Sequence, residues 1–467
     1  MGKRRSRDAT GRCGTVGVIG LPPEAGWFSR RTVAGLGRAL RDGRTSPGDL
    51  VERSLAEASR LGALNAFVTV DGPGARAAAE RAGRELAAGL DRGPLHGVPV
   101  AVKDVVDTAG LRTTRGSRHH ADRVPEHDAE CVRRLRDAGA IIVGKAATHE
   151  FAFGPTGDRS LNGPTRNPYG DGRLAGGSSS GSAAAVAAGI VPLAVGTDTG
   201  GSVRIPAACC GIVGLRPTLG AVPSDGVFPV SCSLDTVGPM ARTADDCLLL
   251  WNVLAGREGP VPDVSGARVG WVVPDALHPV DPRVAAAARA VLEPLPVRDV
   301  AVPDIARMRW AYTAIQGGEV HRLHAARMAA APDLYDPEVL ARLHAAGRVT
   351  AEDTATAREL RERVRSAVTA LFGRFEFLAM PTVPVVAPPL GARTLALNGT
   401  PIDVRAALLA YTSPWSVLGL PAVSLPAGLV DGLPAGLQLI ARPGAERMLL
   451  AAAARLTKTP STAPSQP

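Results

Sequence analysis

Two runs rich in serine and glycine lie in the middle of the chain, and both have residue types that could do chemistry. Ala175–Ser182 reads AGGSSSGS, and Gly196–Pro206 reads GTDTGGSVRIP. A serine hydroxyl attacks a carbonyl carbon only when a neighbouring base removes its proton. Lys103 is a candidate base because it follows the apolar run GVPVAV, where burial would favour a neutral amine. Serines beside a buried lysine are typical of hydrolysis through an ester of the enzyme.

The second run also offers donors for the negative charge that develops during such an attack. Gly200 and Gly201 have no side chains, so their backbone N–H groups can converge on one point in front of Ser202. Loss of one such donor typically costs about 3 kcal/mol of barrier. A tight turn at the end of a strand would explain the two glycines, but it would not explain the whole run TDTGGSVR.

Two other motifs indicate different chemistry and fit less well. Gly139–Lys145 matches the phosphate-loop pattern GxxxxGK, but Ala146 stands where a serine or threonine must bind magnesium. Gly177–Gly181 matches GxSxG, which would make Ser179 the nucleophile. That motif needs a strand directly before the serine, whereas the loop-like NPYGDGRLAGG precedes it. A strand and turn is the preferred interpretation of the first motif, and a Ser-His-Asp hydrolase remains a weaker alternative.

The elements that must position these residues alternate between helices and short apolar strands. Residues 28–62 predict two amphipathic helices around a turn, and residues 76–90 predict a third. VPVAV is a strand that runs into Lys103, and a helix, a glycine and the strand AIIVG follow. The small-residue helix SAAAVAAG and a further buried strand come next. This alternation predicts an α/β protein whose sheet is covered by helices on both faces.

The chain divides into one long domain and two short ends. Residues 1–24 form a basic and, we expect, disordered extension, and residues 457–467 form a disordered tail. Residues 25–456 form the domain, in which residues 281–373 are helical and charged and are expected to cover the substrate. Strand-like runs return after them, and a last helix ends near Leu456.

Composition excludes several classes of function. The net charge of +9 falls to +5 without the first fourteen residues, which leaves 48 basic and 43 acidic residues, mostly scattered. With four tyrosines, eight phenylalanines and five tryptophans, stacking surfaces for nucleic acid are scarce. The six cysteines show no CxxC pattern, so buried free thiols and the reducing cytoplasm are expected. No apolar run is long enough to predict a membrane span.

Several separated blocks of the chain resemble the amidase signature family. Gly176–Thr218 is similar to its signature segment, and the blocks GVPVAVKD, GKAATHEFAFG, SCSLDTVGPMART and TSPWSVLGLPAVSLPAGL are similar to others. The likeness covers roughly residues 25–456. It implies a single large α/β/α domain with a central mixed β-sheet, and an amidase that acts on linear amides.

The resemblance also assigns roles to individual residues. The family's Ser–cisSer–Lys triad falls on Ser202 as nucleophile, Ser178 as relay and Lys103 as base, and the peptide bond between Gly177 and Ser178 would be cis. Ser180 stands where the family commonly has a glycine, and a serine is tolerated there only if its φ is below zero or if strain is accepted. The implied oxyanion hole consists of the backbone N–H groups of Asp198, Thr199, Gly200 and Gly201. The candidate substrate-binding residues are Phe153, Gly177, Arg204 and Trp415, and neither a metal nor a cofactor is required.

These roles predict hydrolysis of a carboxylic amide to an acid and ammonia or an amine. The main interpretation is a free-standing amidase with a small-molecule amide substrate, no nucleic acid and no membrane, and a homodimer is left open. The alternative within the same chemistry is the glutaminase component of a glutamine-dependent aminoacyl-tRNA amidotransferase, in which GPTRNP also occurs. A non-catalytic amidase-like binding protein is a further alternative, but it would be expected to lack one of the three groups.

Overall fold

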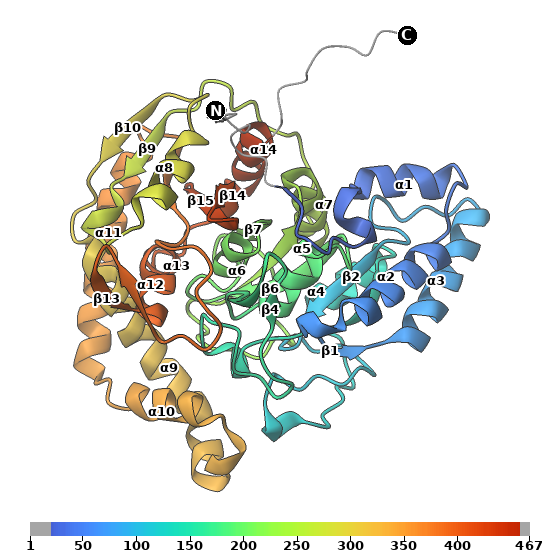
Figure 1. Cartoon of the computed structure of the whole chain (residues 1–467), viewed down its shortest axis with the longest axis horizontal. Helices are drawn as coiled ribbons and strands as arrows, with labels where there is room; N and C mark the ends of the chain where they lie inside the picture. The colour runs from blue at the N-terminus through green and yellow to red at the C-terminus, as the bar shows by residue number, and fades with distance from the viewer. Residues whose placement is uncertain (1–19, 458–467) are drawn as a thin grey trace, which may run out of the picture.

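The fold is built around one sheet of eleven strands, seen across the middle of the molecule in Figure 1. The computed structural model describes residues 20–457, so the predictions for residues 1–19 and 458–467 lie outside the described residues. In spatial order the strands are β1 (Phe67–Val70), β3 (Ile141–Ala146), β2 (Pro99–Lys103), β6 (Leu193–Asp198), β8 (Thr236–Ala241), β7 (Val213–Arg216), β14 (Ala422–Val430), β15 (Leu433–Ile440), β11 (Phe377–Pro381), β9 (Val269–Val272) and β10 (Val297–Val300).

The sheet is mixed. Strand β2 runs parallel to β3 and β6, and β9 runs parallel to β10 and β11. The strands between these groups pair antiparallel, with β14 and β15 forming a long hairpin at the centre. Two small ribbons lie outside the sheet: β4 (Arg166–Asn167) pairs with β5 (Gly170–Leu174), and β12 (Thr394–Leu397) with β13 (Thr400–Asp403).

Helices cover both faces of the sheet, because apolar side chains point to both sides of its strands. In β2, Val100 and Val102 join one hydrophobic cluster, whereas Ala101 between them joins another. The first face packs against α4 (Glu130–Asp137), α7 (Ala244–Ala255), α8 (Pro282–Ala290) and α14 (Glu446–Thr457). The second packs against α2 (Pro47–Arg60), α3 (Gly72–Ala87), α5 (Ser180–Ala187), α6 (Arg204–Cys209), α11 (Ala351–Leu371), α12 (Val404–Ala410) and α13 (Ser413–Val417). The predicted α/β/α architecture is confirmed.

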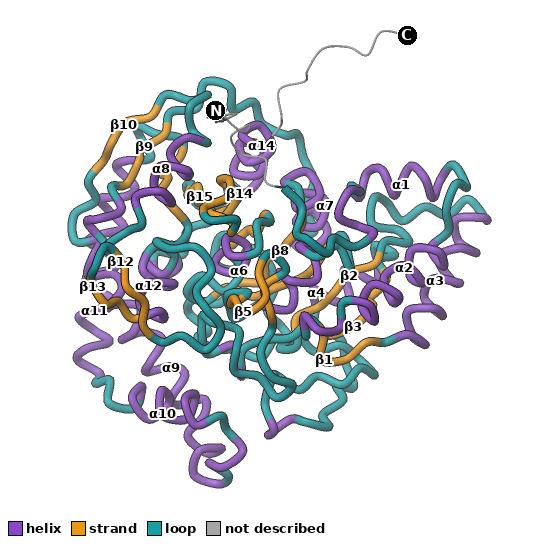
Figure 2. The backbone as a smooth tube through the Cα atoms, in the orientation of Figure 1, coloured by secondary structure: helices purple, strands orange, loops and turns teal. Residues whose placement is uncertain are grey.

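The remaining helices frame the molecule at its two ends. Helix α1 (Val33–Arg41) packs near α2 and α3, and α9 (Met308–Ala330) and α10 (Pro337–Ala346) project from the opposite side with α11 (Figures 1 and 2). The start of α2 follows its sequence closely: Ser46 and Asp49 form a capping box, and Pro47 occupies the first turn. The predicted helical region 281–373 contains α8 to α11, together with strand β10.

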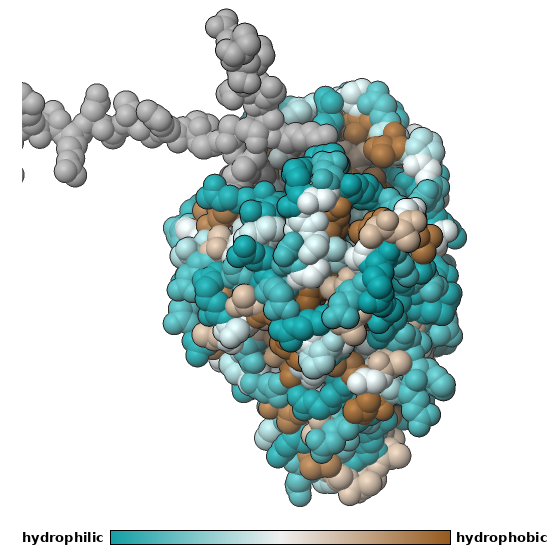
Figure 3. All heavy atoms as spheres, turned by 90° about the vertical axis from the view of Figure 1, so that its right-hand side faces the viewer, coloured by the Kyte–Doolittle hydropathy of each residue, from teal (hydrophilic) through white to brown (hydrophobic). Residues whose placement is uncertain are grey.

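The surface is mixed in hydropathy on the face that Figure 3 turns toward the viewer, where hydrophobic residues are scattered among hydrophilic ones. All five described cysteines are free; Cys131, Cys209, Cys210 and Cys247 are buried as expected, whereas Cys232 is exposed. Cys13 lies outside the described residues. Among residues 20–457, no helix is long and apolar enough to cross a membrane.

Candidate active site

Lys103 ends strand β2 and is completely buried. Every residue of β2 is buried, because the strand lies between β3 and β6 inside the sheet. The Nζ atom of Lys103 lies 2.8 Å from Ser178 Oγ and donates to Thr197 Oγ1 at 2.7 Å. The buried strand before the lysine therefore places its amine beside the hydroxyls of Ser178 and Thr197.

The surroundings of Lys103 favour its neutral form. Burial lowers the pKa of the Lys103 ammonium to about 7, although the negative charges of Asp198 and Asp235 act in the opposite direction. No carboxylate forms an ion pair with it among the described residues. A large share of the amine is therefore unprotonated near neutral pH.

The loop between β5 and α5 presents Ser178. The peptide bond between Gly177 and Ser178 is cis, as the resemblance implies, and Ser178 is fully buried. Ser179 donates through its hydroxyl to Thr197 O, and Ser182 donates to Val195 O, so both fix the loop to β6. Ser180 begins helix α5 and is not among the residues with positive φ. The requirement set by the missing glycine is met.

Ser202 lies at the end of the loop that follows β6, with 8% of its surface exposed. Its carbonyl oxygen accepts from the N–H of Ser179 at 3.1 Å, which joins the two serine-rich runs. The hydroxyls of Ser178 and Ser202 form no hydrogen bond in this structure, in which both residues are described. The structure therefore contains the first hydrogen bond of the predicted relay, between Lys103 and Ser178. It does not contain the second, between Ser178 and Ser202.

The glycine loop in front of Ser202 has room only for glycines. A Cβ on Gly200 would lie 2.5 Å from the Tyr312 ring, and one on Gly201 would lie 2.6 Å from Thr412 Cβ. The backbone N–H groups of Thr199, Gly200 and Gly201 donate to no other group in the described part of the chain. Asp198, in contrast, belongs to β6 and pairs with Thr236.

A buried ionic network holds this loop from behind. Arg204 donates to both carboxylate oxygens of Asp198, at 3.0 and 3.1 Å, and Arg216 donates to the same carboxylate at 3.1 Å. All three side chains are fully buried. Although burial raises the pKa of the Asp198 carboxyl, the two guanidinium groups hold it well below its usual range. The negative charge near Lys103 is therefore permanent.

A small pocket opens beside Ser202. Its wall comes from the loop 152–155, from Tyr312 and Gln316 on α9, and from Arg405 and Leu409 on α12. Phe153 belongs to this wall, as expected. The sequence predicts that residues 281–373 cover the substrate, and this region contains Tyr312 and Gln316. The sequence did not indicate Arg405, which lies in a short amphipathic segment without a motif.

Three other expected binding residues do not line this pocket. The Arg204 guanidinium donates to Asp198, Gln438 and Ser416. These hydrogen bonds hold the end of β6, where the loop to Ser202 begins. Trp415 is fully buried in a hydrophobic cluster with the helices of the second face. Gly177 packs against the backbone of Gly154 and Gly157, where a side chain would collide. Their binding roles stay predictions.

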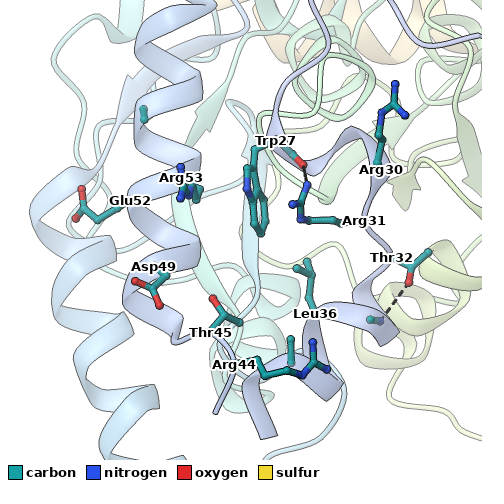
Figure 4. A pocket seen from close by; sticks show the side chains of 13 residues that line it. Trp27, Arg30, Arg31, Thr32, Leu36, Arg44, Thr45, Asp49, Glu52 and Arg53 are labelled. Carbon is teal, nitrogen blue, oxygen red and sulfur yellow. Dashed lines mark hydrogen bonds between the residues drawn. The ribbon is translucent and has the colours of Figure 1, made fainter. Parts of the chain in front are cut away.

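A larger hollow of about 940 Å³ lies far from these residues in the fold, between η1 (Trp27–Arg30), α1 and α2. Figure 4 shows Arg31 beside Trp27, with the guanidinium carbon 3.5 Å from the ring centroid. No residue of the proposed triad lines it. Within residues 20–457, no group of three or more metal-ligating side chains is assembled either.

The mixed α/β sheet covered by helices is the fold of amide-hydrolysing enzymes, as the comparisons with known proteins show. The family model described as Amidase matches residues 49–450. The chain belongs to this family, the amidase signature enzymes, and it is an enzyme that hydrolyses C–N amide bonds.

Three relatives illustrate the range of the family. The chain is 37% identical to the A-type subunit of glutamyl-tRNA(Gln) amidotransferase from Deinococcus radiodurans, over 91% of this chain and 96% of that protein. It is 35% identical to AtzE, a component of the 1-carboxybiuret hydrolase of Pseudomonas sp., over 90% and 96%. A crystal structure of an amidase superposes with a TM-score of 0.87 at 36% identity, over 91% of this chain and 99% of that chain.

These relatives correct the partner prediction. Both named enzymes are subunits of larger assemblies, and the first is named for a tRNA. Several further relatives at 36–38% identity carry the same amidotransferase name. The prediction of a small-molecule amide substrate without nucleic acid is therefore wrong. The alternative of a glutaminase subunit is better supported than the free-standing amidase.

Proposed function

We propose that this chain is the amide-hydrolysing A-type subunit of a glutamine-dependent aminoacyl-tRNA amidotransferase. Its work is to release ammonia from a carboxamide through an ester on Ser202. The observation that carries the proposed chemistry is the contact of 2.8 Å between a buried lysine amine and Ser178, directly behind the glycine loop of Ser202.

The chemistry follows from the states of these groups. Neutral Lys103 accepts the proton of Ser178, and Ser178 in turn takes the proton of Ser202 as its oxygen attacks the amide carbon. This transfer requires a hydrogen bond between the hydroxyls of Ser178 and Ser202, which the structure does not contain although it describes both residues. Ser178 then returns the proton to the departing nitrogen, and ammonia leaves. Water cleaves the ester by the same transfers in reverse.

The oxyanion requires donors that are not already used. The N–H groups of Thr199, Gly200 and Gly201 meet this condition, which supports them as the oxyanion hole. Asp198 is better explained by its ion pairs with Arg204 and Arg216. Those arginines fix the end of β6, so the donors are in position before the substrate arrives.

The role as a subunit rests on the relatives at 35–38% identity, which cover about nine tenths of this chain. A tagged chain purified from the cells that make it tests this role. We expect further subunits to co-purify, and we expect ammonia release from glutamine to accelerate when glutamyl-tRNA(Gln) is added. A chain that purifies alone and ignores the tRNA would contradict the proposal. The five cysteines among the described residues are all free, which fits a reducing compartment such as the cytoplasm.

A second candidate is a hydrolase component that acts on another carboxylated amide, as in the relative named for 1-carboxybiuret. One observation favours it. The pocket wall contains Arg405 but no acidic side chain, whereas glutamine carries an ammonium group as well as a carboxylate. In this case the tagged chain would co-purify with a partner protein, yet its rate would not respond to tRNA.

A further inference from the structure

Arg405 is an arginine without a partner at the wall of the candidate active site. It is the second residue of α12 and lines the same pocket as Ser202. Its guanidinium forms no ion pair and donates no hydrogen bond to any described residue, and its Nε atom is buried. Most other buried or half-buried arginines of the chain have a carboxylate, as Arg204 and Arg393 do. A buried donor without an acceptor is costly unless a ligand satisfies it.

Positive charge accumulates around Arg405. Burial, and next the charge of Arg405, lower the pKa of Arg309 to about 10 and that of Arg342 to about 10. Arg342 is ion-paired with Glu338, but Arg309 donates only to the hydroxyl of Thr313. Asp403, two residues before Arg405, is the cap of α12 and accepts from the N–H of Ala406. Like charges in a half-buried place repel one another, and an anion between them would relieve that repulsion.

The polar atoms of the pocket wall divide by function. Ser202 and Thr199 lie at the reacting end, and Arg405 lies on α12 with Leu409 one turn away. Tyr312 and Gln316 are already joined, because Gln316 Nε2 donates to Tyr312 Oη at 2.6 Å. No aspartate or glutamate belongs to the wall in the described part of the chain. The wall can therefore bind a carboxylate and has no carboxylate of its own to pair with an ammonium group.

We propose that Arg405 binds a carboxylate at the far end of the acyl group whose amide is cleaved at Ser202, and that the pocket does not recognise an α-ammonium group. This proposal rests on the proposed function of Ser202. The substrates are then amides that end in a carboxylate, and Arg405 determines the specificity for these over neutral amides. Arg309 contributes positive charge without direct contact.

Two amides of equal chain length measure the contribution of the terminal carboxylate to kcat/KM. Glutarate monoamide and pentanamide differ only in that the first ends in a carboxylate and the second in a methyl group. In Arg405→Gln, kcat/KM for glutarate monoamide should fall about 10- to 100-fold, as expected for a lost charged hydrogen bond. For pentanamide it should stay within twofold. In Arg405→Lys, kcat/KM for glutarate monoamide should lie between the values for the unmodified chain and Arg405→Gln, since lysine keeps the charge but lacks the planar guanidinium. Arg365→Gln, at a surface ion pair with Glu362, is the matched control. It should change kcat/KM for neither amide.

The unmodified chain tests the ammonium half of the proposal. Glutamine differs from glutarate monoamide only by its α-ammonium group, so the two should be cleaved with kcat/KM values within about tenfold of each other. A stronger preference for glutamine would overturn this half. Equal losses for both five-carbon amides in Arg405→Gln, or no loss for either, would overturn the carboxylate half.

A binding measurement separates this proposal from the chemistry of Ser202. Calorimetric titration of glutarate monoamide into Ser202→Ala should show binding, and the added Arg405→Gln change should weaken it by the same factor of about 10 to 100. If Ser202→Ala were fully active while Arg405→Gln still weakened binding, the proposed nucleophile would be wrong and the carboxylate site would stand. If Ser202→Ala were inactive and Arg405→Gln left binding unchanged, only the carboxylate site would be wrong.

Discussion

The Nζ atom of Lys103 lies 2.8 Å from Ser178 Oγ, although 75 positions separate the two residues in the chain. The lysine comes from the end of a central strand, and the serine comes from the loop before α5. Thr197 on the neighbouring strand accepts from the same Nζ atom. Three segments thus meet on one amine, and burial of that amine gives it the properties of a base.

Lys103→Met should abolish catalysis while keeping the fold. Methionine fills nearly the same volume in a buried strand, and it removes a buried polar group rather than adding one. We expect kcat to fall by a factor of about 10³ or more, with a melting temperature equal to or above that of the unmodified chain. Steady-state kinetics and thermal unfolding monitored together check this prediction. A variant that keeps a tenth of the activity would contradict the role of Lys103 as base.

Thr197→Val should shift the pH dependence of the reaction. The Thr197 hydroxyl accepts a hydrogen bond from Lys103 and stabilises the ammonium more than the amine. Its loss should lower the pKa of Lys103 further, so the half-maximal point of the kcat/KM profile should move to lower pH. A drop of about tenfold in kcat should accompany the shift, because the lysine loses a positioning contact. An unchanged midpoint would show that Thr197 acts on the fold alone.

Gly200→Ala should damage the oxyanion loop through a collision. The added Cβ would lie 2.5 Å from the Tyr312 ring, and overpacking of this kind costs about 1–3 kcal/mol. We expect kcat to fall by about 10²-fold, together with a lower melting temperature. Gly266→Ala is the matched control, since nothing lies within 4 Å of its Cβ position. Equal melting temperatures for the two alanine variants would be inconsistent with the packing described.

Asp198→Asn should destabilise the chain strongly. The substitution leaves Arg204 and Arg216 buried without their shared carboxylate, and breaking a buried pair costs about 3–5 kcal/mol. Glu52→Gln, at the exposed pair with Arg76, should cost less than about 1 kcal/mol. Denaturant unfolding of both variants measures the contrast. Similar losses in the two would refute the buried network as a stabilising element of the site.

The central strands could be predicted because their sequences are locally unambiguous, whereas the triad was assigned from the resemblance to a family and stays a prediction. A fully apolar run before Lys103 is consistent only with a buried strand, and the two serine-rich runs mark the loops beside it. Strands β9 and β10, in contrast, are short, and β10 is partly polar; they form because β11 offers an edge for parallel pairing. The four residues of β9 do not reveal that β11, much later in the chain at Phe377–Pro381, will pair with them.

The substrate pocket was predicted less well than the catalytic groups for a similar reason. Trp415 was expected in the wall because it is large and aromatic, but it fills the hydrophobic layer behind α12. Arg405 looks like an ordinary surface arginine of a short helix until the fold brings it beside Ser202. The prediction of no nucleic acid relied on charge and aromatic content, which do not reveal whether an enzyme acts together with a tRNA.

The most direct test of the triad is the rate at which a fluorophosphonate labels the chain as pH is varied, with the labelled residue identified by mass spectrometry. Because Lys103 must be neutral to act and its pKa lies at about 7, the labelling rate should fall about tenfold for each pH unit below that value and level off above it. The adduct should sit on Ser202. Labelling at Ser179, or a rate that does not vary from about pH 5 to about pH 8, would contradict the proposed base and nucleophile.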